Sequence, residues 1–160
     1  MKRLILLLII LSLAGGCAHV ISEQLRKEAD GEIPPRELFG NPDAYKGRIV
    51  ILGGVIASST NTDKGTYIEV VQKPLDYRER PKDTDVSYGR FLVLSGGYLD
   101  PAIYSRGKLV TVAGEVMGKT VRPLGEMQYP YTLIRAGEIH LVERSRPLPI
   151  WFGIGVGATF

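Results

Sequence analysis

Cys17 is the single cysteine of the chain, and the residues before it would allow its thiol to carry a lipid. A basic pair, Lys2-Arg3, is followed by an apolar run over residues 4–13 and by the small residues Ala14-Gly15-Gly16. A charged start, an apolar stretch and small residues at a cut site form a secretory signal. The stretch is shorter than the roughly 20 residues that a transmembrane helix requires. We therefore predict a signal peptide over residues 1–16 and a diacylglycerol on Cys17.

The four residues that end at Cys17 resemble the lipobox of the lipoprotein signal peptidase. They depart from it at one place, since Ala14 stands where leucine is usual and Leu13 lies one position earlier. The alternative is an ordinary secretory peptide cut nearby, which would leave a free thiol. A lone unpaired cysteine is unusual in an oxidising compartment, so we favour lipidation.

The net charge of the mature chain is close to zero. Removing residues 1–16 takes away two of the 20 basic residues, Lys2 and Arg3, and none of the 17 acidic ones, so the formal charge falls from +3 to +1. A balance of this kind does not favour nucleic acid as a partner. The mature length suits one domain, and no second cysteine is present for a disulfide.

Histidine is the next residue type that could do chemistry. His19 lies two residues after Cys17 and is expected at the surface, whereas His140 lies between Ile139 and Leu141 and falls on the polar face of a strand. As a general base His140 would need a serine and an orienting acid nearby. The chain has no His-x-x-x-His pattern and no carboxylate-rich loop, so we predict no metal and no cofactor apart from the lipid.

The loop over residues 72–89 is the strongest candidate for binding. Basic and acidic residues alternate in it, which usually marks a solvated surface, but tyrosine and arginine are also favoured at contact hot spots. An envelope glycan or a partner protein would suit these side chains. The candidate binding residues are Tyr77, Arg78, Arg80 and Tyr88.

The elements that position these residues are mainly strands. Period-two alternation and β-branched residues predict strands over 48–56, 66–72, 90–95 and 108–117, and a fifth over 131–134 and 138–142. Gly53-Gly54 is expected to bend the first strand, the turn-forming residues 58–65 to end it, and Ala136-Gly137 to form a bulge in the last strand. Helical turns are expected over 22–28 and 36–45, with a break at Asn41-Pro42.

Two segments share one pattern. Residues 42–54 and 101–114 each place a turn and a tyrosine before a glycine and a basic residue, followed by an alternating strand with a glycine. Duplication and convergence both explain this echo. The spacing predicts a mainly β fold, a small OB-like β-barrel of about five strands with few short helices.

The tail over residues 150–160 alternates bulky apolar residues with glycine, and it follows the hinge Pro147-Leu148-Pro149. Its length matches one outer-membrane strand, yet a single strand cannot span a bilayer alone. Burial against the barrel or disorder is one reading. Contact with a membrane or with another protein is the other, through Trp151, Phe152 and Phe160.

Several motifs, in order along the chain, resemble the Slp family of outer-membrane lipoproteins, which are starvation- or stationary-phase-associated proteins of Gram-negative bacteria. The resemblance covers most of residues 17–143. It is carried by Asn41-Pro42-Asp43-Ala44-Tyr45-Lys46-Gly47-Arg48, Gln72-Lys73-Pro74-Leu75-Asp76, Gly89-Arg90-Phe91-Leu92 and Val110-Thr111-Val112-Ala113-Gly114. The family has no established catalytic activity. The resemblance therefore implies a non-catalytic envelope stress, structural or binding role.

Ala18 bears on location. Among lipoproteins an aspartate directly after the lipidated cysteine tends to retain the protein in the inner membrane, so Ala18 implies export to the outer membrane, with the protein facing the periplasm. The expected organisation is a signal peptide (1–16), a lipidated tether (17–35), the barrel domain (36–143) and the hinge with its apolar tail (144–160). The alternative function is a periplasmic hydrolase that uses His140.

Overall fold

The structure, a computed structural model, describes residues 19–29, 31 and 33–144. Cys17, Ala18 and the tail residues Trp151, Phe152 and Phe160 lie outside the described residues, so what the sequence predicts for them stays a prediction. No helix in the described part of the chain is long and apolar enough to cross a membrane.

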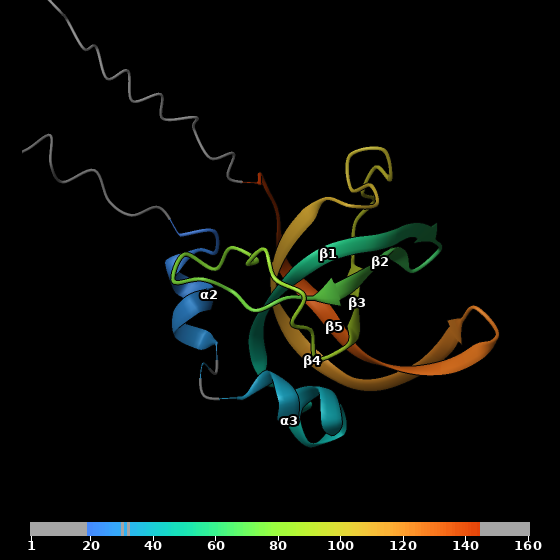
Figure 1. The fold of residues 1–160 in the computed structure, drawn as a ribbon, viewed down its shortest axis with the longest axis horizontal. Helices are drawn as coiled ribbons and strands as arrows, with labels where there is room; N and C mark the ends of the chain where they lie inside the picture. The colour runs from blue at the N-terminus through green and yellow to red at the C-terminus, as the bar shows by residue number, and fades with distance from the viewer. Residues whose placement is uncertain (1–18, 30, 32, 145–160) are drawn as a thin grey trace, which may run out of the picture.

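Five strands form the domain (Figure 1), as the sequence predicts. They are β1 (Ile49–Thr62), β2 (Gly65–Gln72), β3 (Arg90–Ser95), β4 (Leu109–Leu124) and β5 (Met127–Val142). The expected ends of the first and fourth strands and the expected start of the fifth are wrong, since β4 runs on to Leu124 and β5 already begins at Met127. Ser59, Thr60 and Asn61 continue the ladder against β2, although serine, threonine and asparagine read as turn residues.

The strands close into a barrel in the order β1-β2-β3-β5-β4, with β4 pairing back onto β1. All neighbours are antiparallel except β3 and β5, which run parallel from Phe91 opposite Thr132 to Leu94 opposite Arg135. This five-stranded closed order is the expected small OB-like β-barrel. Beyond the barrel, β4 and β5 continue as a long hairpin that ends with Leu124 opposite Met127.

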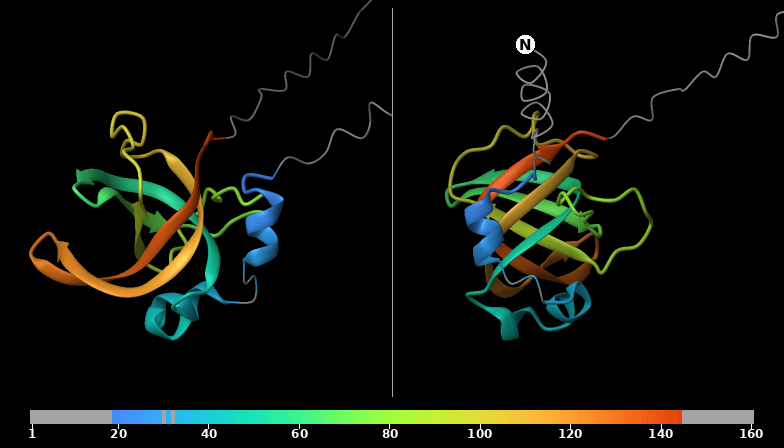
Figure 2. Two further views of the ribbon diagram at one scale, coloured as in Figure 1. Left: turned by 180° about the vertical axis from the view of Figure 1, so that it is seen from behind. Right: turned by 90° about the vertical axis from the view of Figure 1, so that its left-hand side faces the viewer.

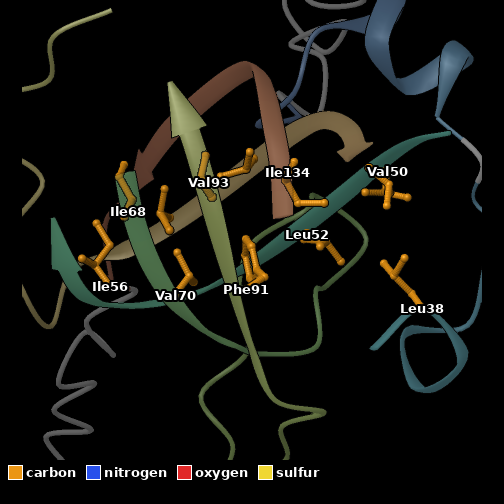
Figure 3. Packing of buried hydrophobic residues seen from close by; sticks show 12 residues of the cluster. Leu38, Val50, Leu52, Ile56, Ile68, Val70, Phe91, Val93 and Ile134 are labelled. Carbon is orange, nitrogen blue, oxygen red and sulfur yellow. The ribbon is translucent and has the colours of Figure 1, made fainter. Parts of the chain in front are cut away.

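Alternation along the strands fills the barrel. In β2, for example, Thr66, Ile68, Val70 and Gln72 are buried while the residues between them are partly exposed. Figure 3 shows these apolar side chains converging from different strands. The cluster of buried residues consists of Leu38, Val50, Leu52, Ile56, Ile68, Val70, Phe91, Val93, Val110, Val112, Val116 and Ile134.

The close approach at Gly54 and the bulge at Ala136-Gly137 are both features that the sequence anticipates. A Cβ on Gly54 would collide with the backbone carbonyl of Val71 on β2, so only glycine fits where β1 bends between its two neighbours. In β5 the register shifts by one residue, because Ala113 lies opposite Glu138 while Gly114 lies opposite Ala136. The predicted bulge at Ala136-Gly137 is therefore present.

Three short helical segments precede the barrel: α2 (Glu23–Glu28), α3 (Pro35–Gly40) and the 3-10 turn η1 (Pro42–Tyr45). Ser22 caps α2, and its hydroxyl accepts the Leu25 N–H at 3.5 Å. The chain breaks between α3 and η1 at Asn41, as expected before proline. Leu38 of α3 is buried and joins the core, so α3 closes one end of the barrel.

The outer wall of β1 and β4 is covered as well. In β4 the residues from Val110 to Gly114 are buried on both faces, and the loop over residues 73–85 lies against this wall at Thr111. Thr111 donates its hydroxyl hydrogen to the Glu79 carbonyl at 2.6 Å, and a Cβ on Gly53 would meet the Leu75 and Pro81 side chains. This wall is where the first described residues also attach.

Residues 19–29 pack on the barrel, where the sequence suggests a tether. Ile21 is 2% exposed, Leu25 lies against Gly137, and the Ser22 N–H donates to Glu138 at 3.0 Å. Figure 2 shows α2 lying beside the wall and the loop. The polar composition of this segment conceals the docking, because only two apolar side chains, Ile21 and Leu25, are shown to carry it.

Candidate functional site

Glu79 joins the first described residues to the loop over residues 73–85. Its carboxylate lies 2.8 Å from His19 Nδ1 and accepts the Val20 N–H at 3.1 Å, while Arg26 Nε lies 4.0 Å away. The Val20 N–H is also 3.3 Å from the Arg78 carbonyl. The Glu79 side chain is only 15% exposed, so these contacts are shielded from water and stronger than surface pairs.

Asp76 shapes the loop that presents Glu79. Its Oδ1 accepts the backbone N–H groups of Arg78 at 2.8 Å and Arg80 at 2.9 Å, and its own N–H donates to the Arg80 carbonyl at 2.8 Å. Glu79 sits at the tip of this turn with φ 58°, in the left-handed region that non-glycine residues seldom adopt. The turn is therefore held by its own hydrogen bonds and aimed at residues 19–26.

The four candidate residues of the loop are not gathered in one place. Tyr77 is 71% exposed and Arg78 lies over its ring at 5.2 Å. Arg80 instead lines two depressions beside the end of β5, and neither includes Tyr77 or Tyr88. Tyr88 lies at the far end of the loop, where its N–H donates to Gln72 at 2.9 Å.

A groove beside Arg80 gathers cationic side chains. It runs between the turn before β4 and the end of β5, and Arg144 Nη2 donates to the Gly107 carbonyl at 3.4 Å across it. Sequence analysis missed this groove because its basic residues come from three separate segments. It is lined by Arg80, Ser105, Arg106, Gly107, Lys108, Leu109, Leu141, Val142, Glu143 and Arg144.

A second group of side chains that sequence analysis missed lies on the other wall of the barrel. We call it the wall cluster. It consists of Tyr67, Glu69, Arg90, Arg122, Tyr129 and Tyr131. Glu69 Oε1 lies 2.7 Å from Arg90 Nη1 and accepts the Tyr131 hydroxyl hydrogen at 3.0 Å. Arg122 lies 4.0 Å from the Tyr67 ring centre. Period-two alternation in β2, which points Tyr67 and Glu69 outward, is the signal that could have identified part of it.

Within the wall cluster, Tyr131 has the most strongly shifted pKa. Burial, helped by the neighbouring Glu69 carboxylate, raises the pKa of Tyr131 to about 12. Its ring also meets the Tyr129 ring edge-on, with centres 4.8 Å apart. Tyr131 is itself buried, so the groups that the cluster offers to a flat polar ligand are the Tyr67 ring with Arg122 over it and the neighbouring Arg90.

His140 is exposed and contacts Glu138, with Nε2 3.2 Å from Oε2. Hydrogen bonds from Ser22, helped by His140, lower the pKa of Glu138 below its usual value. In a hydrolytic triad the histidine lies between serine and carboxylate, whereas here the carboxylate lies between Ser22 and His140. Within the described residues the His140 ring makes no hydrogen bond to a hydroxyl group.

No group of three or more histidine, cysteine, aspartate or glutamate side chains among the described residues is arranged to hold a metal ion.

The model of the outer membrane lipoprotein Slp family matches residues 14–149. No curated protein sequence matches the chain.

Solved structures that partly resemble this chain include two single-stranded DNA-binding proteins. The mitochondrial protein Rim1 of S. cerevisiae is 12% identical and has a TM-score of 0.37, with 64% of this chain and 99% of that chain covered. The small single-stranded DNA-binding protein of Streptomyces coelicolor is 18% identical and has a TM-score of 0.34, with 61% and 95% covered. Similarities of this size carry no information about a ligand of this chain.

Proposed function

The chain belongs to the outer membrane lipoprotein Slp family, and on that premise we propose that it is a non-catalytic lipoprotein, held in the outer membrane by a lipid on Cys17 and facing the periplasm. The observation that carries the proposal is the extent of the family match, which begins at residue 14 and so includes Ala14-Gly15-Gly16 and Cys17. Full acylation of the mature N-terminus would anchor the chain firmly, because one acyl chain alone gives marginal binding.

Metabolic labelling with a fatty-acid analogue tests the anchor. The wild-type chain should incorporate the label, and Cys17→Ala should abolish it and leave the precursor uncleaved. Absence of label on the wild-type chain would overturn the anchor and the location together.

Ala18→Asp provides the matched control, because it keeps the cysteine and changes the sorting position. This variant should still incorporate the label but should shift toward the inner membrane on fractionation. A wild-type chain found wholly in the inner membrane would contradict the proposed location.

We extend the proposal to a binding role toward an envelope glycan or partner protein. The wall cluster supports it better than Tyr77, Arg78, Arg80 and Tyr88 of the loop. Hydrogen bonds join Arg90, Glu69 and Tyr131, and a cation–π contact joins Arg122 to Tyr67. Tyrosine and arginine are the residue types that contribute most at binding surfaces.

Crosslinking in intact cells, followed by identification of the captured partner or glycan, tests this role. Tyr67→Ala combined with Arg122→Ala should reduce capture, whereas Tyr98→Ala, which removes a ring that is 74% exposed elsewhere, should not. Equal capture by all three chains would exclude the wall cluster as the contact surface.

The competing function is a periplasmic hydrolase that uses His140. The contact order Ser22–Glu138–His140 argues against it, since the histidine has no hydroxyl to activate among the described residues. His140→Ala should leave the cellular phenotype of the chain unchanged. Loss of that phenotype in a folded His140→Ala variant would favour the hydrolase instead.

A further inference from the structure

We propose that the barrel rests on the membrane by one defined end, the cationic groove, with anionic phospholipid headgroups as its ligands. The groove is the surface lined by Arg80, residues 105–109 and residues 141–144. The inference rests on the proposed lipid on Cys17, and it adds an orientation and a lipid contact that the anchor alone does not require.

The proposed lipid anchor on Cys17 and the first described residue, His19, are close together in the chain. His19 is two residues from Cys17, and two peptide units span at most roughly 7 Å. His19 Nδ1 is bound to Glu79 at 2.8 Å, and Glu79 directly precedes Arg80 of the groove. The interfacial layer of a bilayer is itself roughly 5–8 Å thick. A lipid on Cys17 therefore brings the turn around Glu79 to the headgroups.

The two ends of the described chain lie at the same end of the barrel. Figures 1 and 2 show the first and the last described residues at the end of the barrel opposite α3. His19 follows the anchor, and Arg144 leads toward the apolar residues 150–160. An anchored chain thus presents this end of the barrel to the bilayer and turns α3 away from it.

This end of the barrel carries an excess of positive charge in the groove. Arg80, Arg106, Lys108 and Arg144 contribute four cations to the groove against one carboxylate, Glu143. The side chains of Arg106 and Lys108 are exposed, and no carboxylate of a described residue pairs with them. Guanidinium groups bind phosphate oxygens in a two-pronged manner, which fits the phosphodiester of a lipid headgroup.

The neighbouring depression limits the contact to this groove. It shares Arg80, Leu109, Val142, Glu143 and Arg144 with the groove, but its lining adds three carboxylates, Asp76, Asp83 and Asp85, beside Lys73 and Lys82. A surface of mixed sign gains little from an anionic membrane. The headgroups are therefore expected at residues 105–109 and 142–144, and the acidic part of the loop is expected to point away from them.

The test uses the lipidated full chain reconstituted in vesicles of equal parts phosphatidylcholine and phosphatidylglycerol. In the lipidated chain Cys17 is a thioether, so an introduced cysteine is the only free thiol. An environment-sensitive dye is attached either at Ser105→Cys in the groove or at Glu126→Cys at the β4–β5 turn. A headgroup-linked quencher should quench the dye at position 105 and leave the dye at position 126 bright.

Charge reversal provides the second arm. Arg106→Glu combined with Lys108→Glu should lose most of the quenching at position 105, and raised salt should do the same for the unreversed chain, because the Debye length is roughly 10 Å at 0.1 M. Arg36→Glu on α3, at the opposite end, is the matched control and should change nothing. Vesicles of phosphatidylcholine alone should also give weak quenching.

Flotation of the same vesicles separates the two proposals. A chain that floats with equally bright dyes at both positions retains the anchor and overturns the orientation. A chain that does not float overturns the proposed anchor itself. Quenching at position 105 that survives charge reversal would place this end near the bilayer and exclude anionic headgroups as the ligands.

Discussion

Glu79 connects parts of the chain that are 60 residues apart in sequence. It accepts the Val20 N–H and binds His19 from a strained backbone conformation with φ 58°. A strained residue persists only where its surroundings hold it, and here the Asp76 turn provides that support. The contact makes the first described residues part of the domain.

Glu79→Ala should release residues 19–22 from the barrel wall. Losing a shielded charged acceptor of this kind costs about 1–3 kcal/mol, and the loss should be local because the five strands keep their pairing. Amide exchange at Val20 should accelerate while exchange within β2 stays unchanged. Asp83→Ala, which removes an exposed carboxylate of the same loop, is the control. Unchanged protection of Val20 in Glu79→Ala would contradict this role.

Tyr131 makes the stability of the domain sensitive to alkaline pH. Its pKa is raised from 10.0 to about 12 in the folded chain, so the folded state holds the phenolic proton after the unfolded state has lost it. The stabilisation is complete below pH 10.0 and is lost as the pH rises toward 12. Denaturation of wild type and Tyr131→Phe over this range should show a steeper fall for wild type.

At neutral pH the same substitution removes the hydrogen bond to Glu69 and should cost about 1 kcal/mol. Tyr98→Phe, at an exposed position, should cost nothing. If the free energies of unfolding of wild type and Tyr131→Phe fall in parallel as the pH rises, another group governs the alkaline pH dependence.

Among the strands, the pairing of β1 depends on a glycine, Gly54. Gly54 pairs with Gln72 of β2 and with Val110 of β4, and the Val71 carbonyl occupies the space of a Cβ. Gly54→Ala must displace backbone in the middle of the ring and should lower stability by several kcal/mol, on the order of the largest single-substitution effects. Gly97→Ala, with nothing within 4 Å of its Cβ, is the matched control. Equal melting temperatures for both variants would refute the argument.

The sequence predicts these elements well where local chemistry decides them. Alternation places β2 and β3, and glycine places the bend of β1 and the bulge of β5. The extension of β1 through Ser59, Thr60 and Asn61 escapes prediction because these residues favour turns in isolation, and only pairing with β2 makes them a strand. The docking of residues 19–29 escapes for a related reason: its partners, Glu79 and Glu138, are distant in sequence.

Across the whole molecule, the closed barrel forms the stable framework, and the candidate binding surfaces lie outside it. β4 returns to β1, so each of the five strands has two paired neighbours and the ring leaves no open edge for a further strand to complete. The candidate surfaces lie outside this ring. The wall cluster and the cationic groove use side chains whose loss would not open it.

Deleting residues 150–160 is therefore expected to leave the domain folded and to weaken an interaction. The described barrel is complete by Arg144, and its core includes no residue after Ile134 among its fully buried members. The tail still carries Trp151, Phe152 and Phe160 in alternation with glycine, a strongly apolar stretch that favours contact with a membrane or partner. The deleted chain should keep the melting temperature of wild type and should co-purify less of any crosslinked partner. Unfolding of the deleted chain would mean that the tail belongs to the core, and the interaction would then be excluded.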